Sequence, residues 1–110
     1  MGTYEFAKTG VVMRYVFDID GVVCTTYGTD YTAAVPVQDV IDRIALLKQQ
    51  EHTIIFYTAR GTVSKTDWRE VTERQFARWS LPYDELHFGK PAGDIYIDDK
   101  ALNVSDWIQL

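Results

Sequence analysis

Apolar runs separated by polar stretches predict four strands. The runs MRYVFDI at 13–19 and TIIFYT at 53–58 are rich in β-branched and aromatic residues, which is typical of buried strands. The shorter run ELHF at 85–88 predicts a weak third strand, and DIYID at 94–98 predicts a fourth. None of these runs is long enough to span a membrane.

Between these runs, apolar residues recur at helical spacing. Pro36 suits a first helical turn, and the residues after it predict an amphipathic helix over about 36–50. A second helix is expected to begin after a cap at Ser64 or Thr66 and to run to about Ser80. The positions expected to face inward are Val37, Val40, Ile41, Ile44 and Leu47 in the first helix, and Trp68, Val71, Phe76 and Trp79 in the second.

The remaining segments complete the expected order. The stretches 24–34 and 59–65 are polar and turn-like and are predicted to be loops, and the tail from Ala101 predicts one short helix. The order β-α-β-α-β-β-α predicts an α/β fold of three layers, Rossmann-like, with a mostly parallel sheet and helices on both faces. We expect a single domain over 13–110, preceded by an extension at 1–12 whose structure the pattern does not define.

Polar residues gather where the predicted strands end. In a parallel sheet these ends lie along one edge, where α/β proteins bind ligands. Crowded carboxylates repel one another, and a divalent cation relieves the repulsion. Since the expected ligands are oxygen atoms only, Mg²⁺ is favoured. The residues concerned are Asp18, Asp20, Thr58, Lys90, Asp98 and Asp99.

This set of residue types suits phosphoryl transfer. Asp18 is the candidate nucleophile, which would form an aspartyl-phosphate. Asp20 would protonate the leaving oxygen and then deprotonate the attacking water. Gly21 permits a sharp exit from the strand. An isolated pair of aspartates would more often be a turn or capping feature, so the prediction depends on the whole set.

The motifs DIDGVV (18–23), YTARG (57–61), FGKP (88–91) and IYIDDKALN (95–103) resemble the haloacid dehalogenase (HAD) superfamily of phosphatases and phosphotransferases. More narrowly, they resemble small phosphatase-like members associated with capsular polysaccharide biosynthesis, which suggests a sugar phosphate substrate. Members of the superfamily often carry a cap domain. The gaps in this chain hold only loops, one helix and a short strand, so we expect a capless form.

The resemblance implies roles for individual residues. Asp18 would be the nucleophile and Asp20 the acid and base. Mg²⁺ would be bound by the Asp18 carboxylate, the Asp20 main-chain carbonyl and Asp98, with Asp99 in contact directly or through water. Arg60 has two interpretations, contact with substrate or pairing with a carboxylate. The candidate substrate-binding residues are Thr58, Ala59, Arg60 and Lys90.

Composition narrows the function classes. The 110 residues carry a net charge of −5 without a run of Lys or Arg, which argues against nucleic-acid binding. Cys24 is the single cysteine, so neither an intramolecular disulfide nor a thiolate metal site is expected. The N-terminal residues do not read as a signal peptide, so we expect a cytoplasmic protein without a membrane partner.

We therefore predict a Mg²⁺-dependent phosphohydrolase that acts on a small phosphorylated metabolite. Two alternatives remain: a phosphotransferase or mutase with the same covalent step, and a noncatalytic binding or regulatory module that keeps the fold. The three tryptophans, Trp68, Trp79 and Trp107, are expected in the core or at an interface. Exposed tryptophans would favour a homo-oligomer, which would cover a capless site.

Overall fold

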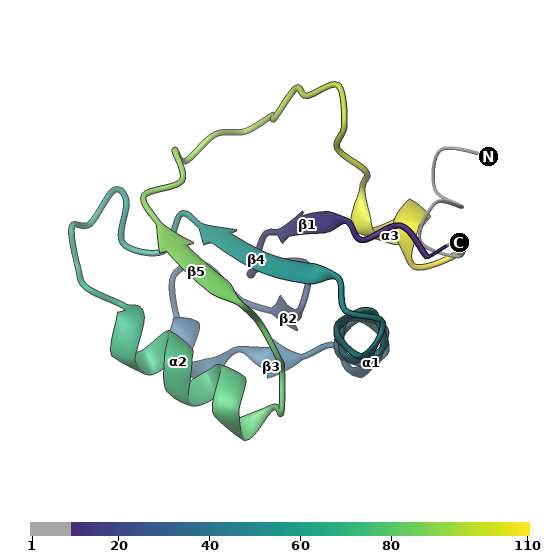
Figure 1. Cartoon of the computed structure of the whole chain (residues 1–110). Coiled ribbons are helices and arrows are strands. Elements are labelled where there is room, and N and C mark those ends of the chain that lie inside the picture. Colours follow the sequence, from purple (N-terminus) through teal and green to yellow (C-terminus); the bar gives the residue numbers. More distant parts are fainter. Residues whose placement is uncertain (1–9) are drawn as a thin grey trace.

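Three parallel strands form the central sheet, in the order β1-β4-β5 (Figure 1). The computed structural model describes residues 10–110, and the expected extension at 1–12 lies largely outside this range. Strand β1 spans Arg14–Phe17, β4 spans Thr53–Thr58 and β5 spans Glu85–Phe88. These bounds confirm the first three predicted strands.

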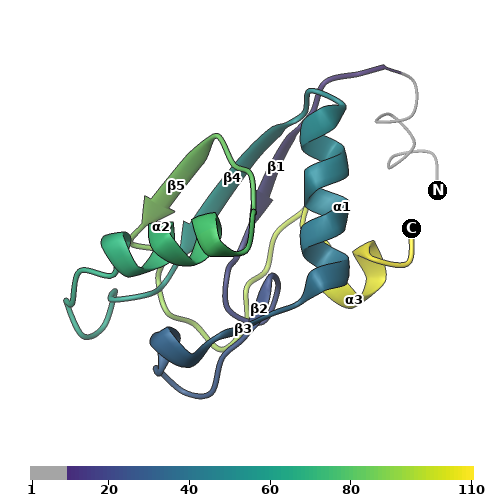
Figure 2. The ribbon, with the colours of Figure 1, turned by 90° about the horizontal axis from the view of Figure 1, so that it is seen from below.

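Two helices cover one face of this sheet (Figures 1 and 2). Helix α1 spans Gln38–Gln49 and α2 spans Arg69–Arg78, close to the predicted helices. The predicted caps are wrong. Position Trp68 precedes α2 without a side-chain cap, and the Asp67 carboxylate accepts a hydrogen bond from the Arg69 main-chain N–H at 3.0 Å. No helix among residues 10–110 is long and apolar enough to cross a membrane.

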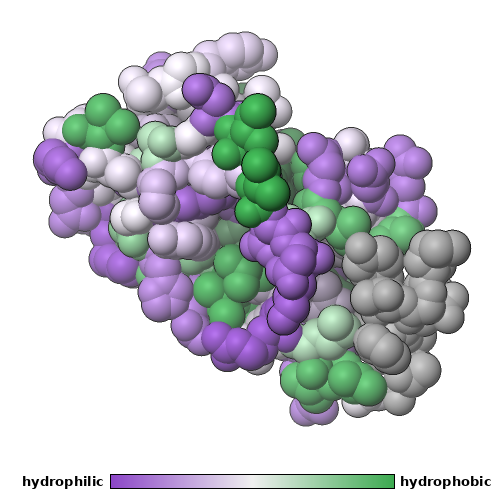
Figure 3. All heavy atoms as spheres, turned by 90° about the horizontal axis from the view of Figure 1, so that it is seen from above, coloured by the Kyte–Doolittle hydropathy of each residue, from purple (hydrophilic) through white to green (hydrophobic). Residues whose placement is uncertain are grey.

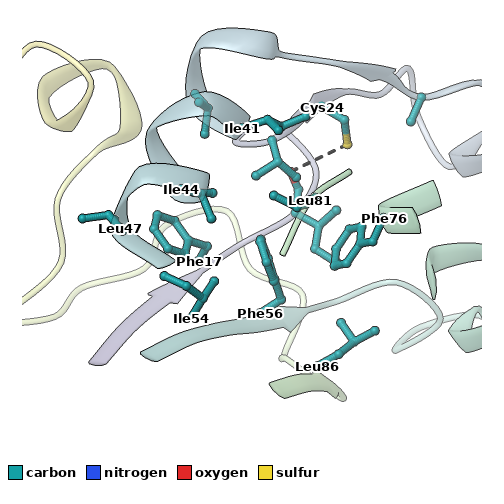
Figure 4. Close-up of a cluster of buried hydrophobic side chains, with 14 residues drawn as sticks. Phe17, Cys24, Ile41, Ile44, Leu47, Ile54, Phe56, Phe76, Leu81 and Leu86 are labelled. Carbon is teal, nitrogen blue, oxygen red and sulfur yellow. Dashed lines mark hydrogen bonds between the residues drawn. The ribbon is translucent and has the colours of Figure 1, made fainter. Parts of the chain in front are cut away.

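The core lies between the sheet and these two helices (Figure 4). Phe17 of β1 and Phe56 of β4 are paired in register, and their rings lie 5.7 Å apart. Phe56 also packs on Phe76 of α2, with ring centroids 4.8 Å apart. Ile44 of α1 is fully buried in the same cluster. Burying side chains of this size stabilises the fold by about 1.5–3 kcal/mol each.

The tryptophans pack against the domain rather than forming an exposed patch. Trp107 lies in α3, which spans Val104–Trp107, and its ring is 5.3 Å from that of Phe17. Arg43 of α1 donates hydrogen bonds to the main-chain carbonyls of Trp107 and Ile108, which ties α3 to α1.

The segment 24–34 is more ordered than predicted. Strand β2, Cys24–Thr25, pairs antiparallel with β3, Val35–Pro36, and the 3-10 helix η2, Tyr31–Ala33, lies between them. Gly21 has a φ of +87°, which a side chain would disfavour, and its N–H donates to the Cys24 carbonyl at 2.8 Å. This turn folds the chain back at the end of β1.

The predicted strand at 94–98 is absent from the described structure. Residues 89–103, called the arm below, leave the end of β5, arch away from the sheet and return to α3 (Figure 1). Ile95 is 79% exposed and Ile97 is 95% exposed, although both are strand-forming apolar residues. The prediction of a fourth strand in the central sheet is therefore wrong for the chain as described.

The expected helices on both faces are also not observed. Within residues 10–110, α1 and α2 share one face, and the opposite face is open. Side chains from all three strands line a hollow on this open face, namely Arg14, Val16, Ile55, Tyr57, Glu85, His87 and Phe88. The fold is thus a small Rossmann-like α/β unit with a two-layer arrangement of sheet and helices.

Candidate functional site

The carboxyl edge of the sheet brings together residues that are far apart in sequence. Asp18 follows β1, and Lys90 follows β5. The Lys90 ammonium lies 3.3 Å from the Asp18 carboxylate, Nζ to Oδ2. The Lys90 main-chain N–H donates to the Thr58 carbonyl at 3.0 Å, and the Thr62 hydroxyl donates to the Lys90 carbonyl at 2.8 Å. Lys90 is therefore held at both its main chain and its side chain.

Asp18 is the more accessible of the two leading carboxylates. Its side chain is 35% exposed, and Oδ1 accepts the Ile19 main-chain N–H at 2.8 Å. Oδ2 faces Lys90, which places a positive charge beside the oxygen. Asp18 thus presents a partly exposed carboxyl group next to a fixed cation, an arrangement that suits a nucleophile toward an anionic phosphate.

Asp20 is instead locked in an ion pair with Arg60. Arg60 donates from Nε to Oδ2 at 3.0 Å and from Nη2 to Oδ1 at 2.9 Å, a bidentate geometry. The Thr26 hydroxyl adds a bond to Oδ1 at 2.6 Å. Burial acts to raise the pKa of Asp20, but the bonds and charge of Arg60, together with the Thr26 bond, outweigh it and lower the pKa. Asp20 is therefore ionised at neutral pH.

Arg60 is buried, with 1% of its surface exposed, and its guanidinium N–H groups all have partners. Besides its two bonds to Asp20, it donates from Nη1 to the Thr72 hydroxyl at 3.0 Å and to Gln75 Oε1 at 2.7 Å. The remaining Nη2 N–H points to the Cys24 sulfur at 3.8 Å. A guanidinium has five N–H donors. In this structure all five have partners within the chain, which agrees with the interpretation that Arg60 pairs with a carboxylate.

Thr58 ends β4, which lies between the strands that Asp18 and Lys90 follow, and Ala59 comes next in the chain. Thr58 is fully buried, and its hydroxyl oxygen accepts the Arg60 main-chain N–H at 3.1 Å. The Ala59 carbonyl accepts the Thr62 N–H at 3.0 Å, which shapes the turn after β4. Both residues therefore hold the loop that carries Arg60 and Thr62.

Asp98 and Asp99 are not brought to this edge in a single copy. Both are exposed on the arm, and the Asp98 carboxylate accepts the Lys100 main-chain N–H at 2.9 Å. This bond, followed by one with Asp99, lowers the pKa of Asp98. Among residues 10–110, no three acidic, histidine or cysteine side chains gather to hold a metal ion. The predicted Mg²⁺ site is therefore not assembled within one copy.

The sequence prediction missed the polar residues that surround Arg60. Thr72 and Gln75 are buried positions on the inward face of α2, with 0% and 2% exposure. Polar residues that interrupt an apolar helix face are a signal that a buried partner is present. The Tyr31 ring, 4.9 Å from the guanidinium carbon, completes this shell. Its position in η2 had no counterpart in the sequence pattern.

Comparisons with known proteins define the fold. No protein-family model matches the chain, and no curated protein matches it. The crystal structure of a structural-genomics target from Vibrio cholerae superposes with a TM-score of 0.83 at 24% identity, covering 90% of this chain and 89% of that one. A chain of the Pnkp1/Rnl/Hen1 complex superposes with a TM-score of 0.60 at 22% identity. This match covers 83% of the present chain and 32% of the other.

Proposed function

We propose that this protein is a phosphohydrolase that acts on a small phosphorylated metabolite, such as a sugar phosphate, through an aspartyl-phosphate on Asp18. The observation that carries the proposal is the contact between Asp18 and Lys90, 3.3 Å apart at the carboxyl edge of the sheet. An accessible carboxylate beside a fixed ammonium can attack phosphorus while the ammonium neutralises the phosphoryl oxygens. The sugar phosphate preference depends on the resemblance to HAD phosphatases.

The chemistry has two steps. An Asp18 carboxylate oxygen bonds to phosphorus as the ester P–O bond breaks, and the leaving alkoxide takes up a proton. Water then adds to phosphorus, gives up a proton and releases inorganic phosphate with the free Asp18 carboxylate. Lys90 stays paired with the negative charge throughout, and its main-chain bond to Thr58 keeps it in place.

Asp20 is the candidate for both proton transfers, and its contacts set a condition on that role. A general acid works best with a pKa near the working pH, whereas Arg60 and Thr26 lower the pKa of Asp20. The Asp20 carboxylate must therefore release at least one of these bonds and take up a proton from solvent before it can protonate the leaving oxygen. Its side chain is 25% exposed, so the carboxylate is not fully shielded from solvent.

Mg²⁺ is part of the proposal because HAD phosphatases, which the motifs resemble, use it. A single copy does not supply the full set of ligands. Asp18 and the Asp20 main chain lie at the edge of the sheet, while Asp98 and Asp99 are on the exposed arm. When bound, the ion would neutralise the phosphoryl oxygens.

The test is hydrolysis of p-nitrophenyl phosphate with Mg²⁺ and with EDTA. We expect metal-dependent turnover that Asp18→Asn abolishes, because the amide is not a nucleophile. Asp42→Asn is the matched control: Asp42 is exposed on α1 and bonds to Gln38, so turnover should be unchanged. Full activity of Asp18→Asn would refute the covalent mechanism.

A second candidate is a noncatalytic module that binds phosphate-like groups. The bidentate ion pair between Asp20 and Arg60 favours this second candidate, because a carboxylate held this firmly is a poor proton donor. Beryllium fluoride binding measured by calorimetry, without turnover of a panel of phosphorylated sugars, nucleotides and phosphoproteins, would support this module.

A further inference from the structure

Strand β1 has a free edge. It pairs with β4 on one side, and within residues 10–110 no strand pairs with its other side. Val16, in the middle of β1, is 63% exposed. An unpaired strand edge offers a row of N–H and C=O groups to an extended segment. Residues 94–98 of the arm are such a segment, in which Ile95, Tyr96 and Ile97 are all exposed.

The arm of the same copy cannot reach this edge as a parallel strand. Only residues 89–93 separate β5 from position 94. The six residue steps from Phe88 to Asp94 span at most about 20–22 Å when fully extended. A strand beyond β1 lies three strand spacings away, about 14 Å, and the chain must also return about 13 Å along the sheet. That path, about 20 Å in a straight line, passes through the sheet itself, and a route around it is longer. Parallel crossovers accordingly use a dozen or more residues.

We propose that residues 94–98 of one copy pair in parallel with the free edge of β1 in a second copy, and that the reciprocal exchange forms a twofold dimer. The arm of a second copy can pair with this edge without a crossover, because it approaches β1 from outside the sheet. The exchange of an identical element is a common route to dimers.

The side-chain pattern agrees with one register. If Asp98 of the arm lies beside Asp18, then Asp94 lies beside Arg14, whose side chain is 66% exposed. Ile95 and Ile97 then fall on the helix-covered side, next to Tyr15 and Phe17 of β1. Figure 3 shows green, hydrophobic groups beside purple, hydrophilic ones on the side where the arm lies, and Ile95 and Ile97 are among the exposed apolar residues.

This register also has a consequence for the site, which depends on the proposed function. The arm of the second copy would carry its Asp98 and Asp99 to Asp18 of the first. The acidic set that a single copy leaves apart would then be complete, with each site shared between two copies.

The first test is the oligomeric state by size-exclusion chromatography with light scattering. We expect a dimer for the wild type and a monomer for Ile97→Asp. Ile97 is 95% exposed in the single copy, so the substitution should leave the circular dichroism spectrum and the monomer fold intact. Val63→Asp is the matched control, since Val63 is 78% exposed on another loop, and it should remain dimeric. A monomeric wild type would overturn the proposal.

The second test is a cross-link between two differently tagged chains, one carrying Val16→Cys and the other Tyr96→Cys. In the proposed register these positions are opposite each other, within reach of a disulfide. We expect a mixed dimer on a non-reducing gel, and no such product when Val63→Cys replaces Val16→Cys. Cys24 is buried and should not interfere. Absence of the cross-link would overturn the register.

The third test is complementation between inactive variants. Co-expressed Asp18→Asn and Asp98→Asn chains should recover about a quarter of wild-type turnover, because half of random dimers are mixed and each has one intact site. Co-expressed Asp18→Asn and Asp20→Asn chains should recover none, because Asp18 and Asp20 of a given site come from the same copy and every site then lacks one of them. Cross-linked dimers without turnover would refute the proposed function and leave the exchange standing. Turnover by a monomer would refute the shared site and leave the proposed function standing.

Discussion

Arg60→Met is the substitution that tests the buried ion pair most directly. Methionine keeps much of the side-chain volume but removes all the hydrogen-bond donors. Asp20 would lose its bidentate partner, while the Thr72 hydroxyl and Gln75 Oε1, both buried, would lose theirs. The variant therefore isolates the cost of leaving polar groups unpaired near the site.

The size of the effect follows from these contacts. Removing one partner of a buried ion pair costs about 3–5 kcal/mol. Leaving buried acceptors unpaired costs about 1–3 kcal/mol each, although the terms are not additive. Asp20 is 25% exposed and can regain water, which reduces the loss. We expect the free energy of unfolding to fall by about 3–5 kcal/mol, a large share of the roughly 5–15 kcal/mol typical of a domain.

The assay is urea unfolding followed by circular dichroism, with Arg43→Met as the matched control. Arg43 is half-buried and donates two hydrogen bonds to the end of α3, but it has no carboxylate partner within the described chain. Its loss should cost only about 1 kcal/mol. If Arg60→Met destabilises the protein no more than Arg43→Met does, the interpretation of Arg60 as the centre of a structural network is wrong. A double-mutant cycle with Asp20→Asn then measures the coupling of the pair.

Two further predictions concern the same edge of the sheet. Gly61 has a φ of +79°, and a Cβ there would lie 2.1 Å from the Thr66 carbonyl oxygen, so Gly61→Ala should lower the unfolding midpoint strongly in urea. Gly28→Ala, with a φ of +60° and open space around it, should cost only the conformational strain of about 1–2 kcal/mol, and equal effects of the two would contradict the clash. The lowered pKa of Asp20 predicts a pH dependence: its contribution to stability is present above the ordinary value of 3.8 and is lost as the pH falls through the lower folded value. The stability difference between wild type and Asp20→Asn should therefore shrink in acid, and a difference that stays constant down to acid unfolding would rule out this linkage.

The local elements were predictable from the sequence. The run TIIFYT forms β4 over the predicted residues, and the apolar spacing after Pro36 forms α1. These elements follow from short-range patterns, because alternating burial and helical periodicity are properties of a few consecutive residues. The meeting of Asp18 with Lys90 at one edge also follows, since parallel strands align their ends.

The fate of other residues depended on the assembled fold. Arg60 was open to two interpretations until α2 placed Thr72 and Gln75 around it, and no spacing along the chain encodes those contacts. The run at 94–98 has the composition of a strand, yet a strand forms only where a free edge lies within reach of its connection. The chain by itself determined which segments can form strands and helices. Only the tertiary structure decided which of them find partners within one copy, because pairing depends on the positions of distant edges and the length of chain between them.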